Sequence, residues 1–163
     1  MPDMPETRTP IMSGDLIGKR PPYPAQTLLG FDFGTRRIGV AVGQRITSTA
    51  SALITLAARD GQPDWTQVAQ LIATWQPDAL VVGLPLQLDG SRSEVTDAAE
   101  RFARRLEGRF RLPVYLYDER LSSHAADHWQ SEHRGSEHSR RDSLDEVAAR
   151  IILQDWLDSR GDT

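Results

Sequence analysis

Asp32 is the residue whose type and surroundings most strongly indicate chemistry. It lies in the apolar strand that opens the stretch 28–42, and a Gly-Thr-Arg-Arg turn and a second apolar strand follow within that stretch. An ionised carboxylate in a hydrophobic strand costs free energy unless it is paired or binds a metal ion. Asp32 is therefore the first candidate for a functional residue.

Two further acidic positions lie where a strand end and a helix start are expected. Asp118 and Glu119 directly follow the apolar run 114–117. Ser143 has capping-box spacing to the glutamate three positions later, so the last helix is expected to start there. Asp145 then lies in the first turn of that helix, at the edge of its apolar stripe.

These carboxylates have a structural explanation as well as a functional one. The positive end of a helix dipole accounts for Asp145, and a turn after a strand accounts for Asp118 and Glu119. Sites in open α/β sheets form outside the carboxyl ends of strands, however, where Asp32 and Glu119 are both expected. Converging carboxylates repel one another unless cations bind them, and two metal ions would stabilise both oxygens of an in-line phosphoryl displacement. The chain has no cysteine and only four histidines, so oxygen ligands and therefore Mg²⁺ or Mn²⁺ are expected.

Hydrophobic periodicity predicts the elements that must position these residues. The expected strands are 27–33, 37–44, 46–56, 79–84 and 113–117, and the expected helices are 63–75, 95–106, one from Leu121 that ends before Gly135, and 143–158. Residues 132–142 are charged and polar, which indicates an exposed loop. This order predicts an α/β fold with a five-stranded mixed sheet, helices on both faces and right-handed crossovers between its parallel strands.

The N-terminal segment differs in composition from the rest of the chain. Six prolines fall within its first 24 residues, so residues 1–26 are expected to be a disordered tail before a single domain, 27–160. No apolar run is long enough for a membrane span, and the absence of cysteine fits a cytoplasmic protein. The net charge of −4 argues only weakly against nucleic acid as a partner, because carboxylates elsewhere can mask a basic face.

Four motifs resemble, in the same order, those of the YqgF-type Holliday-junction-resolvase-like family, whose members are described as pre-16S ribosomal RNA nucleases. They read FDFGTRRIGVA at 31–41, VGLPLQLDG at 82–90, DERLSS at 118–123, and LDEVAA at 144–149 followed by IIL at 151–153. Each motif is short, but four of them in family order, spanning about residues 27–158, are specific.

The resemblance implies a ribonuclease H-like fold and metal-dependent cleavage of phosphodiester bonds. It implies that Asp32, Glu119 and Asp145 are the catalytic and metal-binding carboxylates. The implied role is trimming the 5′ end of precursor 16S ribosomal RNA in the cytoplasm, with precursor RNA and ribosomal particles as partners.

The fourth strand departs from the pattern of related resolvases, which carry a carboxylate there. Residues 81–85 contain none, so Glu119 must act from the fifth strand. In the implied sheet order, Glu119 lies two strand spacings from Asp32, or roughly 10 Å between backbones. Asp89 and Asp142 are the reserve ligands.

Four arginines are candidates for holding substrate phosphates, and each also has an ordinary structural role. Arg36 and Arg37 lie one turn from Asp32, and Arg120 follows Glu119. The fourth is Arg92, which precedes a helix N-terminus. The alternatives are a solvated turn, a pair with Asp118 and ordinary capping.

Other side chains are candidates for contacts with RNA. Arg101, Arg104 and Arg105 form a basic helix face of the kind that contact with an RNA backbone needs. Such a face is usually only a solvated surface, and this one is interleaved with Glu100 and Glu107. The tryptophans Trp65, Trp75 and Trp156 are expected in the core, and Trp129 is the better candidate for an exposed contact.

Three alternative functions remain open at this point. One is cleavage of branched DNA, and another is a non-catalytic RNA-binding factor for ribosome assembly. The third is a phosphate-binding turn like that of actin-like ATPases, which Asp-Phe-Gly-Thr also resembles. Those ATPases need two such domains, and this chain has the length of one.

Overall fold

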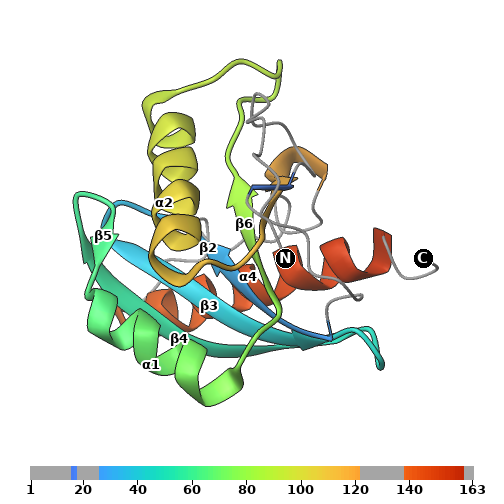
Figure 1. Ribbon diagram of the computed structural model, residues 1–163. Helices are drawn as coiled ribbons and strands as arrows, with labels where there is room; N and C mark the ends of the chain where they lie inside the picture. Colours follow the sequence, from blue (N-terminus) through green and yellow to red (C-terminus); the bar gives the residue numbers. More distant parts are fainter. Residues whose placement is uncertain (1–15, 18–25, 122–137, 160–163) are drawn as a thin grey trace, which may run out of the picture.

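A computed structural model describes the backbone of residues 16–17, 26–121 and 138–159, and the side chains of 26–120 and 144–159. Its strands are β1 (Leu16–Ile17), β2 (Thr27–Asp32), β3 (Arg37–Gln44), β4 (Thr49–Arg59), β5 (Gln62–Pro63), β6 (Ala79–Leu84) and β7 (Val114–Asp118). Its helices are α1 (Trp65–Trp75), α2 (Glu94–Phe110), the short 3₁₀ helix η1 (Glu119–Leu121) and α4 (His138–Ser159). Figure 1 shows how these elements are arranged.

The strands form one mixed sheet in the order β1-β7-β6-β2-β3-β4-β5. Strands β2, β3 and β4 are an antiparallel meander, whereas β6 pairs in parallel with both β2 and β7. The five expected strands are all present, which confirms the predicted mixed sheet. The predicted count of five strands is too low, because the sheet also contains β1 and β5. These strands have two residues each and are too short to give a periodic signal.

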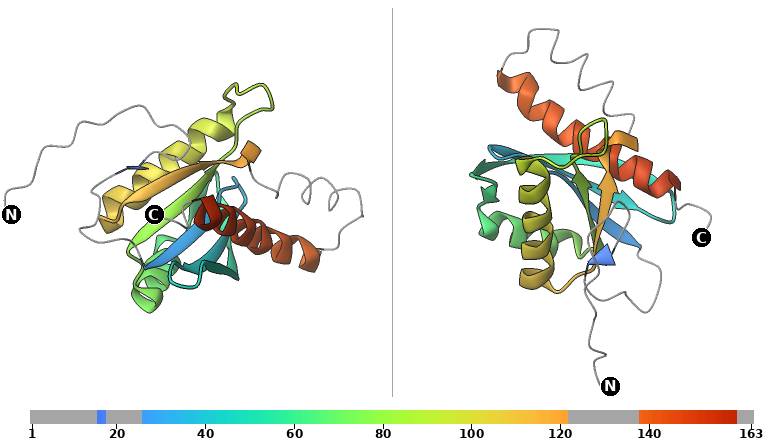
Figure 2. Two further views of the ribbon diagram at one scale, coloured as in Figure 1. Left: turned by 90° about the vertical axis from the view of Figure 1, so that its right-hand side faces the viewer. Right: turned by 90° about the horizontal axis from the view of Figure 1, so that it is seen from above.

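Helices cover both faces of this sheet, as expected. The second view of Figure 2 shows α4 on one side of the sheet and α1 and α2 on the other. Large side chains such as Phe31 and Phe102 form the core under α1 and α2, with ring centroids 5.6 Å apart. A second core under α4 contains Leu28, Ile152 and Trp156. Because β2, β6 and β7 are parallel, their carboxyl ends lie at the same edge of the sheet, between the two helical layers.

Helix α2 begins and ends with clear local signals. Ser93 and Thr96 form a capping box, in which each side chain accepts a hydrogen bond from the other residue's backbone N–H. Thr96 also donates its hydroxyl to the backbone carbonyl of Pro85, at the end of β6. The helix ends at Arg111, which adopts a left-handed conformation with φ of 56°. These contacts fix α2 to the loop that follows β6.

Several expected boundaries are wrong, and the starts of two elements show why. Strand β4 begins at Thr49 instead of 46, because residues 45–48 form a turn in which Ser48 has a φ of 53°. Helix α4 begins at His138, so Ser143 does not start it and 138–142 are not a loop. No glycine or proline separates 138 from 143, and charged residues alone do not end a helix.

Other expectations have mixed outcomes. Trp156 is buried and Trp65 is partly buried, but Trp75 is exposed at the end of α1. Beyond η1, the helix expected to start at Leu121 and the contact expected of Trp129 lie outside the described residues. In the part of the chain that the structure describes, no helix is both long and apolar enough to cross a membrane.

The N-terminal segment reaches the sheet at one point. Strand β1 pairs antiparallel with β7, with Leu16 opposite Tyr115 and Ile17 opposite Val114. Two residues of the expected tail thus extend the sheet at the outer edge of β7.

Candidate active site

A pocket of about 440 Å³ lies at the carboxyl edge of the parallel strands. Three elements bring the predicted carboxylates to it, since Asp32 ends β2, Glu119 follows β7 and Asp145 lies on α4. The pocket is lined by Asp32, Phe33, Gly34, Arg37, Pro85, Leu86, Leu88, Glu119, Arg120 and Asp145. The structure therefore gathers residues that are separated by more than 110 positions in sequence at one place.

Asp32 and Glu119 meet although β6 lies between their strands. Their side chains share a hydrogen bond. The contact crosses β6 at Gly83, where an added Cβ would lie 3.0 Å from Oε1 and 3.1 Å from Cγ of Glu119. Because Gly83 has no side chain, Glu119 can reach across β6 to Asp32. This explains how the two carboxyl groups meet although their backbones were expected to lie roughly 10 Å apart.

Glycine also brings Asp145 close to the sheet. Gly39 pairs with Asp32 across β2 and β3, and a Cβ added to it would overlap the backbone carbonyl of Asp145. Ala148 and Ala149 are buried in the same part of α4, as their small size predicts. Farther along, Gln154 accepts from the backbone N–H of Ala50 at 3.0 Å, which anchors α4 to β4. The close approach of α4 is therefore a consequence of small residues on both surfaces.

The ionisation of Glu119 is disfavoured in this setting. Burial raises the pKa of the Glu119 carboxyl above its usual range. The hydrogen bond with Asp32 opposes this shift, and the negative charge of Asp118 adds to it. The Asp32–Glu119 contact is thus favourable when a proton or another cation is present.

Asp118 is in the opposite situation, although it is only 3% exposed. Its burial acts to raise its pKa, but the hydrogen bonds and charge of Arg120 hold the pKa of Asp118 below its usual range. The Arg120 guanidinium lies 2.6 Å from Oδ2 of Asp118. The structure therefore pairs Arg120 with Asp118, and Arg120 still lines the pocket.

Asp145 is paired as well. The Nε of Arg37 donates a hydrogen bond to Oδ2 of Asp145 at 2.9 Å, and both side chains are about one third exposed. Within the described side chains, no three Asp, Glu, His or Cys residues lie close enough together to bind one metal ion. The pocket thus holds one pair of carboxylates in contact and a third carboxylate bound to an arginine.

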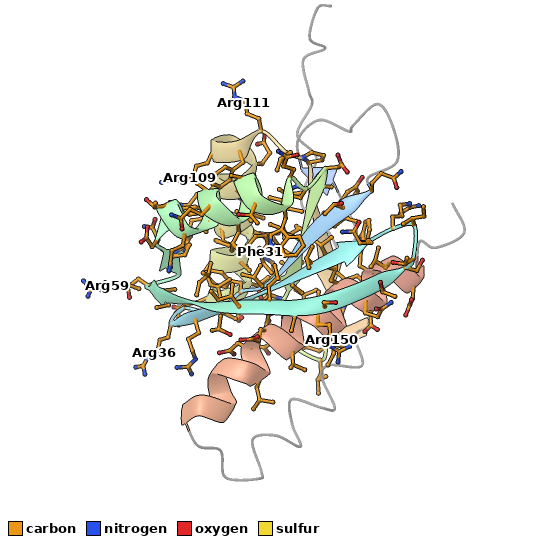
Figure 3. The ribbon with its side chains drawn as sticks, turned by 90° about the horizontal axis from the view of Figure 1, so that it is seen from below. Phe31, Arg36, Arg59, Arg109, Arg111 and Arg150 are labelled. Atoms are coloured by element: carbon orange, nitrogen blue, oxygen red, sulfur yellow. The ribbon has the colours of Figure 1, made fainter. Side chains whose placement is uncertain are left out.

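Three of the remaining predicted residues, Arg36, Arg92 and Asp89, are not part of the pocket lining. Arg36 is exposed, and Figure 3 shows it pointing away from the body of the molecule. Arg92 bonds to Asp97 at 2.6 Å and also to Glu100 on α2. Asp89 accepts a hydrogen bond from the backbone of Ser91 within the loop after β6. The side chain of the other reserve ligand, Asp142, lies outside the described residues.

Sequence reasoning missed the residues that make the site geometrically feasible. Gly39 and Gly83 carry no functional group, so nothing in their type pointed to the site. Their one signal was the presence of glycine inside apolar strands, which often marks a close approach of another group. Leu88 was missed as well, and its near-complete exposure at the pocket is visible only in the structure.

Comparison with known sequences gives a consistent result. Residues 26–159 match the sequence model of the RuvX family, described as Holliday junction resolvase. A relative from Pseudomonas putida named "Putative pre-16S rRNA nuclease" is 54% identical over 133 residues, which cover 81% of this chain and 94% of the relative. A relative of the same name from Azotobacter vinelandii is 53% identical over 133 residues, which cover 82% and 94%.

Solved structures share the fold at low sequence identity. The RuvC protein of T. thermophilus in complex with a Holliday junction substrate has a TM-score of 0.51 at 17% identity, over 85% of this chain and 97% of that one. The Fowlpox virus resolvase in complex with Holliday junction DNA has a TM-score of 0.50 at 10% identity, over 83% and 99%. These likenesses confirm the expected ribonuclease H-like fold.

Proposed function

Because the chain belongs to the RuvX family of Holliday junction resolvases, we propose that it is a metal-dependent nuclease that processes precursor 16S ribosomal RNA. The expected substrate is the 5′ end of that precursor. RNA is proposed as the substrate because the relatives are named as pre-16S rRNA nucleases. The absence of cysteine supports a cytoplasmic location. Binding to ribosomal particles is part of the same proposal.

The observation that carries the proposal is the meeting of Asp32, Glu119 and Asp145 at one pocket. Carboxylate oxygens are the ligands that Mg²⁺ and Mn²⁺ prefer in proteins. The contact between Asp32 and Glu119, with the pKa of Glu119 raised, favours a cation beside the pair. The donor chemistry therefore fits divalent metal ions, which Asp32, Glu119 and Asp145 would hold between them, with no single ion bound by all three.

Bound metal ions would activate a water molecule and neutralise charge that develops on the phosphate. The chain's own residues then bind and orient the substrate. Arg120 and Arg37 present guanidinium groups to the pocket, where they would bind phosphate oxygens. Leu88, almost fully exposed at the pocket, offers apolar surface against which a nucleobase would pack.

The test is cleavage of labelled precursor 16S ribosomal RNA by the purified chain with Mn²⁺, Mg²⁺ or EDTA. We expect cleavage with a divalent metal and its loss in Asp32→Asn, which keeps the size of the side chain and removes the charge. Circular dichroism of both proteins is the folding control. If Asp32→Asn cleaves as fast as the unmodified chain, the proposed site is wrong. If neither protein cleaves but both bind RNA, a non-catalytic assembly factor is the better description.

Cleavage of branched DNA is the second candidate, because the family is described as Holliday junction resolvase. The same preparation is assayed on a four-way DNA junction beside the RNA. A rate on the junction that exceeds the rate on the RNA by tenfold or more would replace RNA processing with junction resolution, at the same three carboxylates.

A further inference from the structure

The outer face of α2 carries an unusual concentration of positive charge for a chain with a net charge of −4. Within 101–111 there are five arginines and one glutamate. Phe102, Ala103 and Leu106 are fully buried against the sheet. Four of the arginines point to the other side of the helix or extend from its end. They are Arg101, Arg104, Arg105 and Arg111, which together are called the arginine stripe.

The structure removes part of the ordinary explanation for this face. Glu100, which interleaves the arginines in the sequence, is only 7% exposed and is paired with Arg92. Within the described residues, Arg101, Arg104 and Arg105 form no ion pair. Of the two glutamates that interleave the arginines, Glu100 is therefore directed to Arg92 and away from the stripe.

Helix stability does not explain the stripe either. Arg101 lies three residues from Arg104 and four from Arg105, and like charges at these spacings destabilise a helix. The helix dipole favours a cation only in the last turn, where Arg109 lies. Arg109 already has a partner, because its guanidinium lies 4.3 Å from the centre of the Trp65 ring. The guanidinium groups of Arg101, Arg104 and Arg105 thus repel one another, and binding of an external anion would reduce this repulsion.

The stripe begins near the pocket. Thr96, in the first turn of α2, is bonded to Pro85 of the pocket lining. At 1.5 Å per residue, Arg101 and Arg105 lie about 8 and 14 Å farther along the helix axis than Thr96. Figure 3 shows Arg111 projecting from the body at the end of α2. Arg101 and Arg105 are therefore spaced along the helix over a range that successive phosphates of a nucleic acid extending beyond the pocket would span.

We propose that the arginine stripe is a second RNA-binding surface that holds the sugar–phosphate backbone of the substrate outside the cleavage pocket. This inference rests on the proposed function, which supplies RNA as the ligand. Arginine binds phosphate through paired donors and constant charge, without reading sequence. The stripe therefore contributes affinity that depends on salt, and the pocket contributes the chemistry.

The test measures binding of precursor 16S ribosomal RNA across a range of salt concentrations, in the Asp32→Asn background so that the RNA stays intact. The variant is Arg101→Gln/Arg104→Gln/Arg105→Gln, since glutamine is a comparable helix former. We expect a loss of tenfold or more in affinity at low salt. The slope of log affinity against log salt should fall by about 2 to 3, because each lost phosphate contact removes roughly 0.7 to 0.9. The melting temperature should stay the same or rise.

The matched control is Arg101→Lys/Arg104→Lys/Arg105→Lys, which keeps the charge and should retain most of the slope. An unchanged slope in the glutamine variant would overturn the inference, and so would a lower melting temperature, which would assign the stripe to helix stability. The cleavage test of Asp32 separates the two proposals. If the unmodified chain cleaves RNA and the glutamine variant binds it normally, only the stripe is wrong. If the unmodified chain neither binds nor cleaves RNA, both proposals fail.

Discussion

At the residue scale, the two neighbouring acids at the end of β7 have opposite electrostatic surroundings. Glu119 faces Asp32, and its burial disfavours the charged form. Asp118, one position earlier, is bound by Arg120 through several hydrogen bonds. Asp118 therefore stabilises the fold, whereas burying the Glu119 carboxylate lowers stability, as groups in functional sites often do.

Glu119→Gln should stabilise the metal-free protein at neutral pH, by about 1 kcal/mol, while abolishing cleavage. A carboxyl whose folded pKa is raised contributes stability below its unfolded pKa and loses it as pH rises through the folded value. The gain from glutamine should therefore be largest near pH 8 and shrink toward pH 4. Thermal unfolding in EDTA at several pH values measures it.

Asp118→Asn is the opposing control for that experiment. Arg120 lowers the pKa of Asp118 in the folded protein. Asp118 therefore contributes to folding stability above its unfolded pKa, and this contribution is lost as pH falls through the folded pKa. The asparagine variant should be destabilised at neutral pH, with the difference shrinking in acid. If both variants shift stability in the same direction at pH 8, the electrostatic assignment of these two residues is incorrect.

Arg37→Gln should strengthen the binding of Mn²⁺ severalfold. The Arg37 guanidinium occupies Oδ2 of Asp145, so it competes with a metal ion for that oxygen. The ion pair is partly exposed, and its loss should cost no more than about 1 kcal/mol of stability. Calorimetric titration with Mn²⁺ checks the affinity, and a decrease in Mn²⁺ affinity would mean that Arg37 organises Asp145 instead of competing for it.

At the element scale, glycines set the distances between the layers that carry the site. Gly83 on β6 leaves room for Glu119 to reach Asp32 beneath α4. Gly39 on β3 lets the backbone of α4 contact the sheet beside Asp145. The positions of all three carboxylates therefore depend on residues that have no chemistry of their own.

Gly83→Ala should reduce cleavage by about 10- to 100-fold, because small misplacements of catalytic groups have effects of that size. The new Cβ would lie 2.9 Å from Cδ1 of Ile152 and 3.0 Å from Oε1 of Glu119. Both atoms are ends of flexible side chains, so Glu119 should move while the fold persists. Turnover rate and melting temperature are measured together. Full activity would show that Glu119 need not stay where the structure places it.

Gly39→Ala should destabilise the protein by at least 1–3 kcal/mol, the usual range for overpacking, because its Cβ would overlap backbone of α4. Gly108→Ala is the matched control on α2, where an added Cβ meets no atom within 4 Å. It should stabilise the protein by about 0.5–1 kcal/mol, as alanine does in a helix interior. Chemical denaturation compares the two, and equal stabilities would contradict the close approach of α4.

At the scale of the whole molecule, the family match and the longer strands of the sheet begin at the same place in the chain. The match begins at residue 26, and β2 begins at Thr27. Before that point, the structure describes only Leu16–Ile17, which add a short strand to the outer edge of β7. The domain 27–160 is therefore expected to fold by itself.

Removal of residues 1–25 should leave cleavage within about twofold of the full chain and cost about 1 kcal/mol or less. The two-residue strand β1 contributes little pairing, although it covers the edge of β7. Cleavage rate, melting temperature and light scattering compare the two chains. A tenfold loss of activity by the shortened chain would assign the N-terminal segment a part in substrate binding.

The sequence by itself predicted the order of the longer elements and named the three candidate carboxylates. Apolar runs and their periodicity are local, so β2, β6 and β7 could be read directly from residues such as those of 79–84. Asp32 was informative because a charge among buried neighbours is costly wherever the chain folds. The helical segment 138–142 was misread because polar residues are compatible with both a loop and a helix.

Only the tertiary structure decided how these residues meet. The contact of Asp32 with Glu119 depends on sheet order and on the space at Gly83, and neither is encoded in the local pattern. The partners of Arg37 and Arg92 were also undecided, since an exposed arginine binds whichever carboxylate the fold places beside it. Interactions between residues distant in sequence depend on packing, and packing is settled only when all layers of the fold are present.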